Sequence, residues 1–281
     1  MKKKGIVVIK GGFGNQLFQY CMANYLSQQG LSISIDTSFY NKTNFDLTNN
    51  TYRPLVFTPN ELGFKKSSFL NNLFYKFLRK INKLNIKFFT YGHFKGYEHE
   101  GFELKNFNLF DGYWQNLELL KYSRNFLRQS LSKVEGIKNN LENDIPEFNT
   151  LVHIRRNDYV DMNEELDISF YEKALKSMSV LNDQFKYDIF TDDKNWVSKQ
   201  KIFKNVNNIY GKESFGDNSL IIFTNMLKYK NFIISNSTFS LLASFIKYDE
   251  ESNIIFPDPW FRTINHQGFN VENWIPIINE K

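Results

Sequence analysis

Short apolar runs that alternate with helical patterns constrain the fold of this 281-residue chain more than any other feature. Residues 6–9 (Ile-Val-Val-Ile) form the first run, and a glycine-rich turn and a helical pattern of apolar residues follow it before a second run at 31–36. The second half continues the alternation, with strands expected at 151–154, 187–190, 208–210, 231–234 and 254–256. Because strands that alternate with helices form mostly parallel sheets, we expect an α/β fold.

The length of the chain allows one large domain or two of ordinary size, at roughly 100–200 residues each. A charged, Asn-rich stretch at 133–149 contains Pro146 and precedes the strand at 151–154. We therefore predict an N-terminal domain at 1–148 and a C-terminal domain at 149–281. Since Cys21 is the only cysteine, no disulfide can form within the chain, which favours a reducing compartment.

The net charge of +5 and the pI of about 9.0 fit an anionic ligand or an anionic membrane surface, and do not choose between them. The basic residues 2–4 precede an apolar run too short for a signal peptide. No run reaches the ~18 apolar residues of a membrane-spanning helix. We expect a cytoplasmic protein without a nucleic-acid partner, and leave peripheral association with the inner face of the cytoplasmic membrane open.

The segment at 64–96 is basic and amphipathic. No acidic residue lies between Glu61 and Glu98, whereas the interval carries eight Lys and Arg residues and apolar residues at helical spacing. Such a helix suits the surface of an anionic bilayer. A core-packed helix with a solvated basic rim explains the pattern equally well. In either case we interpret the segment as an insertion into the first domain.

Two adjacent arginines, Arg155 and Arg156, follow the strand expected at 151–154. Each guanidinium is a planar, permanently charged fork of donors that matches phosphate oxygens. The carboxyl end of a parallel strand is also where α/β folds place their ligands. The pair therefore predicts a diphosphate site, against the alternative of a surface salt-bridge cluster.

Polar residues also follow two other expected strands. Asp192 and Asp193 come after 187–190, and a Ser-Asn-Ser-Thr-Phe-Ser sequence at 235–240 comes after 231–234. All these strand ends would lie on one rim of the sheet. There, carboxylates could accept hydrogen bonds from guanine, and hydroxyls and amides at a helix start could hold phosphate. Helix N-caps are the alternative for both sets, and their joint occurrence favours a site.

The glycine-rich turn at 11–16 is a third candidate for anion binding, because a helix start presents free amides. It is not a dinucleotide-binding fingerprint, since Leu17 stands at the third glycine position, and no Gly-Lys-Ser/Thr follows as in a P-loop. A tight turn without a ligand is the alternative. A nicotinamide oxidoreductase is also disfavoured. Leu17 stands at the third glycine position, and no acidic residue other than Asp36 lies at the end of the second strand.

Four motifs together resemble those of the α-1,2-fucosyltransferases of glycosyltransferase family 11. They read Gly-Gly-Phe-Gly-Asn-Gln-Leu-Phe-Gln-Tyr at 11–20, His-Ile-Arg-Arg-Asn-Asp-Tyr at 153–159, Phe-Thr-Asp-Asp at 190–193, and Ser-Asn-Ser-Thr-Phe-Ser at 235–240. The resemblance implies a GT-B-like fold, with two Rossmann-like domains facing across a cleft. It implies an inverting enzyme that moves L-fucose from GDP-β-L-fucose to the 2-hydroxyl of a galactose in a glycan or surface polysaccharide. It also implies no cofactor and no metal, and the chain has no Asp-x-Asp sequence.

The resemblance assigns roles by position. Arg155 would grip the β-phosphate and stabilise the leaving GDP, with Arg156 on the loop or the second phosphate. The other expected donor contacts are Gly14, Asn15, His153, Asp192, Asp193, Ser237 and Thr238. We also place Asn15 and the candidate base Asp158 among the catalytic residues, with Asp161, Glu164 and Glu165 as competitors for the base.

Two positions depart from the family pattern: Asn157 stands where Gly is usual, and Leu241-Leu242 where Trp-Trp is usual. Neither departure removes a charged contact. Two other functions stay open, another GDP-sugar transferase on the same scaffold and a non-catalytic nucleotide-sugar-binding subunit. The intact Arg155, Arg156 and Asn15 argue against the second.

Overall fold

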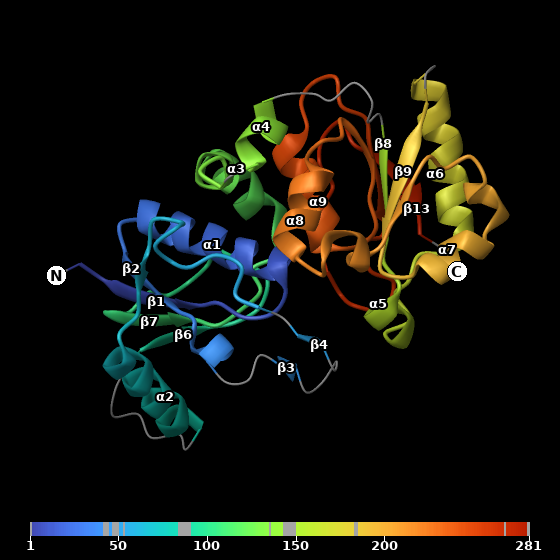
Figure 1. The fold of residues 1–281 in the computed structure, drawn as a ribbon. Helices are drawn as coiled ribbons and strands as arrows, with labels where there is room; N and C mark the ends of the chain where they lie inside the picture. Colours follow the sequence, from blue (N-terminus) through green and yellow to red (C-terminus); the bar gives the residue numbers. More distant parts are fainter. Residues whose placement is uncertain are drawn as a thin grey trace. The chain divides into compact units, whose positions relative to one another are not determined.

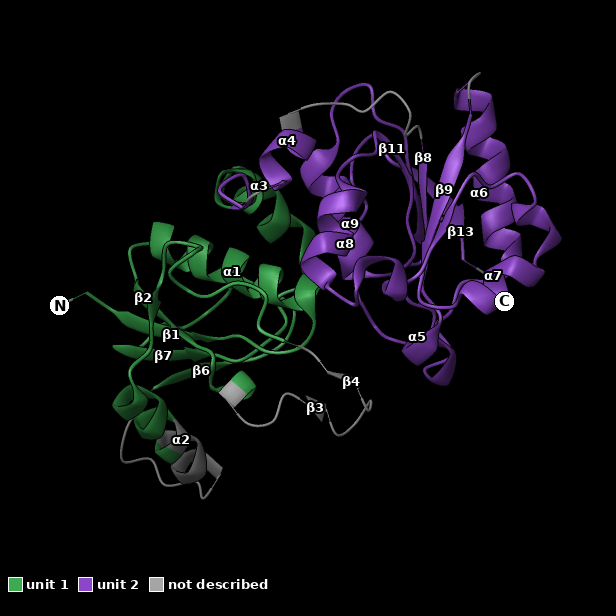
Figure 2. Cartoon of the chain, in the orientation of Figure 1, with its two compact units in different colours: residues 1–130 green, residues 131–281 purple. Residues whose placement is uncertain are grey.

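The computed structural model describes residues 2–41, 45–46, 51–52, 54–83, 91–134, 136–142, 150–182, 185–266 and 268–279. The chain forms two compact units, Met1–Ser130 and Leu131–Lys281 (Figures 1 and 2). Each unit is built on a parallel sheet with helices packed against it. The predicted α/β class with two Rossmann-like domains is confirmed, and their facing across a cleft stays a prediction.

Unit 1 contains a five-stranded sheet in the order β5-β2-β1-β7-β6, whose recorded strand pairs are all parallel. Its strands are β1 (Lys4–Val8), β2 (Ser32–Asp36), β5 (Lys65–Lys66), β6 (Gly92–Phe94) and β7 (Phe107–Phe110). The central β1 is buried from Gly5 to Val8. Burial on both faces explains why its sequence is a continuous apolar run without alternation.

The other elements of unit 1 connect or cover this sheet. Helix α1 (Phe13–Gln28) follows β1 and buries Leu17, Phe18, Cys21 and Met22 completely. The remaining elements are η1 (Ser38–Asn41), the hairpin β3 (Phe45–Asp46) and β4 (Thr51–Tyr52), α2 (Phe69–Lys83) and α3 (Leu117–Leu131).

Unit 2 contains a six-stranded sheet in the order β10-β9-β8-β11-β12-β13, also with parallel pairing throughout the recorded pairs. Its strands are β8 (Thr150–Ile154), β9 (Tyr187–Thr191), β10 (Ile209–Tyr210), β11 (Asn231–Ile233), β12 (Ile254–Asp258) and β13 (Ile275–Ile278). Counted within the unit, this is the order 3-2-1-4-5-6 of the Rossmann fold. The direction of strand succession reverses between β8 and β11, and such folds bind ligands beyond the carboxyl ends of the strands at that point.

Helices cover both faces of the unit 2 sheet (Figure 1). They are α4 (Ile137–Glu142), α5 (Asn157–Asp161), α6 (Ile168–Leu181), α7 (Lys194–Lys199), α8 (Ser219–Met226) and α9 (Thr238–Lys247), with the short η2 (Lys201–Phe203) and η3 (Lys212–Phe215). Phe170, Ala174 and Met178 of α6 share one core cluster with Val152 and Ile189 of the sheet. This core fixes the strand ends that carry the polar motifs.

The two units divide at Ser130, earlier in the chain than the predicted boundary. The predicted boundary, 148/149, lies outside the described residues. The described residues 131–134 and 136–142 belong to unit 2, and α4 within them is hydrogen-bonded to α8 and α9 of that unit. The Asn140 amide donates to the Thr224 carbonyl at 2.7 Å, and the Lys247 ammonium donates to the Asn140 carbonyl at 2.9 Å.

The basic segment at 64–96, predicted to be an insertion, contributes two edge strands and a helix to unit 1. Its two ends form β5 and β6, the opposite edges of the five-stranded sheet, and α2 lies between them in sequence. Tyr75 of α2 packs into a small core cluster with Ile6, Val8 and Leu109. Most of the other apolar side chains described on α2 are exposed, and the core-packed alternative does not account for them.

None of the helices described here is both long enough and apolar enough to span a bilayer.

Candidate active site

Arg155 lies directly beyond the carboxyl end of β8, between two carboxylates. Its Nη1 is 2.9 Å from Asp192 Oδ2, and its Nη2 donates to Asp158 Oδ1 at 2.5 Å. Burial disfavours the charge of Arg155, but the neighbouring carboxylates outweigh burial and raise its pKa. The guanidinium is therefore charged and fixed in position at the point where the strand order reverses.

Arg156 is held by a different set of contacts. Its guanidinium stacks over the Trp196 ring at 4.1 Å, and its Nε lies 3.4 Å from Asp193 Oδ2. Its backbone N–H donates to Asp192 Oδ1 at 2.8 Å. Such cation–π contacts add to an ion pair without neutralising the charge. The two arginines thus share Asp192 as a partner, and each has a second carboxylate of its own, Asp158 for Arg155 and Asp193 for Arg156.

Trp196 was missed in the sequence analysis. The signal that could have found it is the helix cap: the Asp193 side chain accepts the Trp196 N–H at 2.9 Å, which places Trp196 in the first turn of α7, close to the strand end. Asp193 is thereby the N-cap of α7, as one interpretation had proposed. It is also an ion-pair partner of Arg156, so capping does not exclude a place in the site.

His153 connects the two strands at which the order reverses. Its Nδ1 lies 2.7 Å from Ser235 Oγ and 2.9 Å from Ser240 Oγ, so β8 is tied to the turn that follows β11. Burial lowers the pKa of His153 to about 3, and the charge of Arg155 adds to the effect. The ring is therefore neutral near pH 7. Of its two nitrogens, Nε2 remains for the predicted contact with the donor.

The Ser-Asn-Ser turn is bonded to the segment that follows the arginines. The Tyr159 hydroxyl donates to the Asn236 carbonyl at 2.9 Å, and the Asn236 amide donates to the Glu164 carbonyl at 2.7 Å. Ser237 caps α9, where its hydroxyl accepts the Phe239 N–H at 3.4 Å. The structure thus brings the expected motifs at 153–159, 190–193 and 235–240 together at one edge.

Glu164 is one of the competitors for the catalytic base, and in the structure its carboxylate accepts hydrogen bonds from the loop at 262–263. The side chain is fully buried, and its carboxylate accepts the Arg262 N–H at 2.8 Å and the Thr263 N–H at 2.7 Å. Burial raises the pKa of Glu164, but the hydrogen bonds from Thr263 and Arg262 outweigh it and lower the pKa overall. Glu164 thereby ties the loop at 262–263 to the segment that follows α5.

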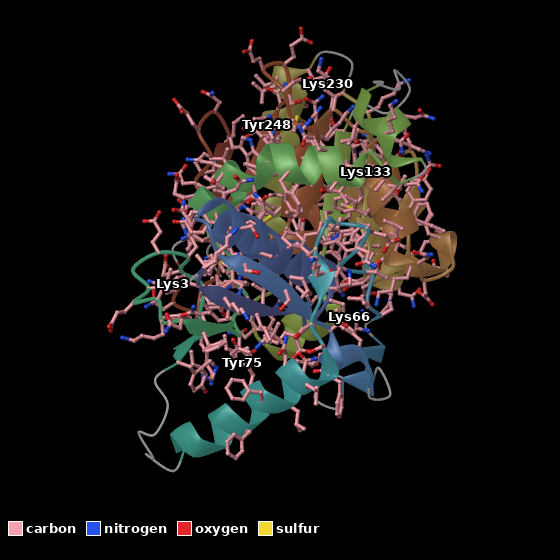
Figure 3. All side chains as sticks on the ribbon, turned by 90° about the vertical axis from the view of Figure 1, so that its left-hand side faces the viewer. Lys3, Lys66, Tyr75, Lys133, Lys230 and Tyr248 are labelled. Carbon is pink, nitrogen blue, oxygen red and sulfur yellow. The ribbon has the colours of Figure 1, made fainter. Side chains whose placement is uncertain are left out.

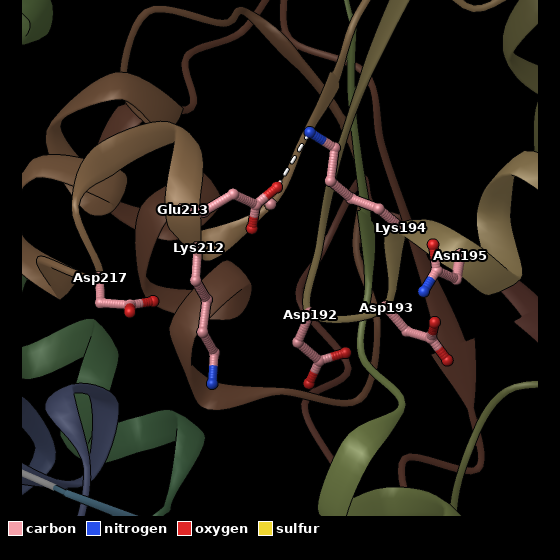
Figure 4. Close-up of a pocket in the computed structure, with 8 residues that line it drawn as sticks. Asp192, Asp193, Lys194, Asn195, Lys212, Glu213 and Asp217 are labelled. Carbon is pink, nitrogen blue, oxygen red and sulfur yellow. Dashed lines mark ion pairs between the residues drawn. The ribbon is translucent and has the colours of Figure 1, made fainter.

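A polar cavity of about 480 Å³ opens beside these residues, at the carboxyl ends of β9 and β10. Its lining consists of Asp192, Asp193, Lys194, Asn195, Gly211, Lys212, Glu213 and Asp217. Asp192 and Lys212 stand on opposite sides of the space, and Lys194 pairs with Glu213 at 3.0 Å (Figure 4). Lys212 and Glu213 follow the short strand β10, which was predicted at 208–210, but they were not among the predicted site residues. Within the described residues, no three His, Cys, Asp or Glu side chains gather to hold a metal ion.

The glycine turn of unit 1 has a different chemistry. Gly11 has a φ of +80°, which side-chain-bearing residues rarely adopt, and its carbonyl accepts the Tyr40 hydroxyl at 2.7 Å and the Gln16 amide at 3.2 Å. Asn15 Oδ1 accepts the Gln115 amide at 2.7 Å. Polar groups of this turn are thus bonded within unit 1, and no charged side chain is among them.

Gly14 is buried in the first turn of α1. Nothing in unit 1 by itself tests the expected donor contacts of Gly14 and Asn15, which stay predictions.

These features define a class of protein: a Rossmann-like α/β protein with two adjacent, carboxylate-paired arginines where its strand order reverses. The model of glycosyl transferase family 11 matches residues 2–277. The chain therefore belongs to glycosyltransferase family 11, and the predicted family is confirmed.

Two curated relatives from Escherichia coli extend over nearly the whole chain. The O-antigen biosynthesis glycosyltransferase WbnK is 25% identical, covering 96% of this chain and 99% of the relative. An alpha-1,2-colitosyltransferase is also 25% identical, covering 96% of this chain and 97% of the relative. Among solved structures, the fucosyltransferase NodZ from Bradyrhizobium is similar with a TM-score of 0.45, at 17% identity over 86% of this chain and 93% of that one.

Proposed function

We propose that this glycosyltransferase moves L-fucose from GDP-β-L-fucose to the 2-hydroxyl of a galactose, in a glycan or O-antigen-type surface polysaccharide. The observation that carries the proposal is the pair of fixed guanidiniums, Arg155 and Arg156, beyond β8 at the reversal of strand order. Membership of family 11 and the name of the relative WbnK support the sugar-transfer chemistry and the polysaccharide acceptor.

The donor's diphosphate would lie against the arginines, and its nucleoside in the adjoining cavity. As the bond to fucose breaks, negative charge grows on the GDP oxygens, and prepositioned cationic donors stabilise that charge. Arg155 would meet the β-phosphate and Arg156 the second phosphate. Asp192 and Asp193 lie between the arginines and the cavity, where they would contact guanine or ribose. We propose that no metal takes part.

Asp158 would act as the base that accepts the proton of the acceptor hydroxyl. In the structure its carboxylate is bonded to Arg155. Phosphate oxygens that bind Arg155 would compete with this carboxylate, because a guanidinium offers a limited number of donors in fixed directions. Donor binding would thereby weaken the Arg155–Asp158 pair and make the carboxylate available for the incoming hydroxyl.

A second candidate function, transfer of another sugar from a GDP-linked donor, is favoured by the relative named as a colitosyltransferase. Its 25% identity equals that of the relative WbnK, so relatedness alone does not choose the sugar. The strand-end contacts proposed above would serve either donor, since they address the GDP portion.

A panel of GDP-sugars and defined galactosides tests the proposal, with product linkage determined by NMR and parallel reactions in EDTA. We expect a fucosyl α-1,2 linkage from GDP-fucose and an unchanged rate in EDTA. Turnover with a different GDP-sugar and none with GDP-fucose would show that the proposed donor is wrong. Loss of turnover in EDTA would show that the reaction needs a metal. Tight GDP binding without turnover on any acceptor would support the non-catalytic subunit.

A further inference from the structure

The α2 helix exposes an apolar surface, made of Phe69, Leu70, Leu73 and Phe77, that the catalytic proposal does not use. The exposed fractions of these side chains are 78%, 74%, 52% and 55% in chain order. Their positions i, i+1, i+4 and i+8 fall on one face of a helix. Four large apolar residues on one helix face, all at least half exposed, mark an interaction site, whereas single exposed apolar residues do not.

A different face of α2 attaches the helix to unit 1. Tyr75 is only 5% exposed and packs with Ile6, Val8 and Leu109 of the sheet. Asn72 donates its amide to Asp36 Oδ1 at 2.9 Å. Figure 3 shows Tyr75 turned toward the rest of the unit and other side chains of α2 extending away from it. The helix is therefore held in place by its polar and tyrosine contacts, and the apolar surface is left outside.

The charge around α2 indicates what covers this surface. Lys65 and Lys66 in β5 are exposed and precede the helix directly, and no acidic residue occurs anywhere from 62 to 97. The sequence of the helix contains four further basic residues, Lys76, Arg79, Lys80 and Lys83. Two copies of so basic a segment would repel each other across an interface. An apolar face bordered by basic residues instead complements an anionic bilayer.

We propose that α2 lies in the interface of a membrane that contains anionic phospholipids. Phe69, Leu70, Leu73 and Phe77 enter the boundary between headgroups and acyl chains, and the exposed Lys65 and Lys66 contact the lipid phosphates. This inference does not depend on which sugar the enzyme transfers. It gives the protein a membrane attachment that sequence alone had left open against core packing.

Vesicle flotation of the full chain measures this attachment. We expect binding to vesicles that contain phosphatidylglycerol, at least about 10-fold weaker binding to pure phosphatidylcholine, and weakening by salt, as for other basic surfaces. The variant Phe69→Ser/Phe77→Ser should lose binding by at least about 10-fold, because it removes apolar area that enters the bilayer. Val180→Ser is the matched control, since Val180 on α6 is also 78% exposed but has no such surroundings.

A local probe distinguishes insertion from loss of folding. Cys21 is the only native cysteine and is buried, so a thiol introduced by Phe77→Cys can be labelled with an environment-sensitive fluorophore. We expect its emission to rise and shift to shorter wavelength with phosphatidylglycerol vesicles, while a label at Val180→Cys does not change. Equal binding to both lipids, an unchanged Phe77→Cys label, or a dimer in solution that Phe69→Ser/Phe77→Ser dissociates would each overturn the proposal.

Discussion

The first strand of each unit ends in a turn that leads into a helix, and the two turns differ in the side chains that they carry. Beyond β1, Gly11 and Asn15 take part in neutral hydrogen bonds with side chains of the same unit. Beyond β8, Arg155 and Arg156 are charged and paired with carboxylates. The topology alone therefore does not make a diphosphate site. The side chains at the strand end decide which of two similar edges can hold concentrated negative charge.

The buried charges beyond β8 also require partners that compensate them. Removing charged groups from water is costly unless partners compensate them. Asp192, with a side chain only 4% exposed, is compensated by the Arg155 guanidinium and the Arg156 N–H. Beyond β1 an ion pair also occurs, Lys10 with Asp111 at 2.8 Å, whereas Gly11 and Asn15 of the turn take part in neutral hydrogen bonds. Variants at the two turns should thus differ both in their effect on catalysis and in their effect on folding.

Arg155 should give the largest effect on activity. We expect Arg155→Lys to lower kcat for sugar transfer by about 100- to 1,000-fold, the range seen when one charge-stabilising donor is lost. Lysine keeps the charge between Asp158 and Asp192 but lacks the planar fork. Steady-state kinetics with GDP-fucose measure the change. Lys173→Ala, on the exposed side of α6, is the control for loss of a cation.

The Arg155→Lys result is interpretable only if the protein folds, so thermal unfolding accompanies the kinetics. If a folded Arg155→Lys variant kept a rate within about threefold of the wild type, the proposed stabilisation of the transition state by Arg155 would be wrong. A threefold change corresponds to well under 1.4 kcal/mol.

Asp158→Asn tests the proposed base at the same edge. We expect kcat to fall by about 100-fold, within the range for general base catalysis, while GDP binds at least as tightly as before. Tighter binding would follow because Asn cannot compete with phosphate for Arg155 as a carboxylate does. Kinetics and GDP titration calorimetry separate the two effects. Unchanged kcat with tighter GDP binding would leave Asp158 as a counter-ion of Arg155 and not the base.

Asn15→Ala in unit 1 should have a smaller effect, about 10-fold or less in kcat/KM, because a single neutral hydrogen bond contributes about 0.5–1.5 kcal/mol. Gln115→Ala is the matched variant, since it removes the partner of Asn15 Oδ1 and leaves Asn15 in place. If Asn15 contacts the donor, only Asn15→Ala should raise KM for the donor. Equal effects of both variants would reduce the role of Asn15 to holding its own turn.

The sequence predicted the charged edge well because each of its motifs follows a strand directly. Parallel strands bring their carboxyl ends to one rim, so Arg155, Asp192 and Ser237 needed no long-range information to be placed together. The same logic failed for strands without an apolar run. β12 was expected to be the last strand, and β13 was missed because Pro276 interrupts a four-residue edge strand. The two-lysine β5 gave no strand signal at all.

Roles that depend on distant partners were beyond the sequence. Glu164 and Asp158 are both acidic residues near the arginines, and only the fold shows that Arg262 and Thr263 occupy the Glu164 carboxylate. The exposed apolar face of α2 is a similar case. Helical spacing predicts a stripe of apolar residues but does not say whether the stripe faces the core or solvent.

His153 should have the smallest effect on catalysis, yet it reports on the same edge through pH. Its folded-state pKa of about 3 lies below its ordinary 6.5, so the unfolded chain binds a proton there that the folded chain does not. Stability is therefore complete above pH 6.5 and falls by up to about 1.4 kcal/mol per pH unit below it. Glu164, with its pKa lowered from 4.5, acts only in more acidic solution.

Urea unfolding of the wild type and of His153→Asn, compared near neutral pH and near pH 5, isolates this contribution. The other three histidines are common to both proteins, so their titration cancels in the difference. We expect the wild type to lose more stability than the variant as the pH falls. Only the wild type has an imidazole that is neutral in the folded protein and takes up a proton on unfolding. Equal losses would mean that His153 is protonated in the fold. A proton on Nδ1, the atom bonded to Ser235 and Ser240, would then add a positive charge beside Arg155 and change the electrostatics of the whole edge.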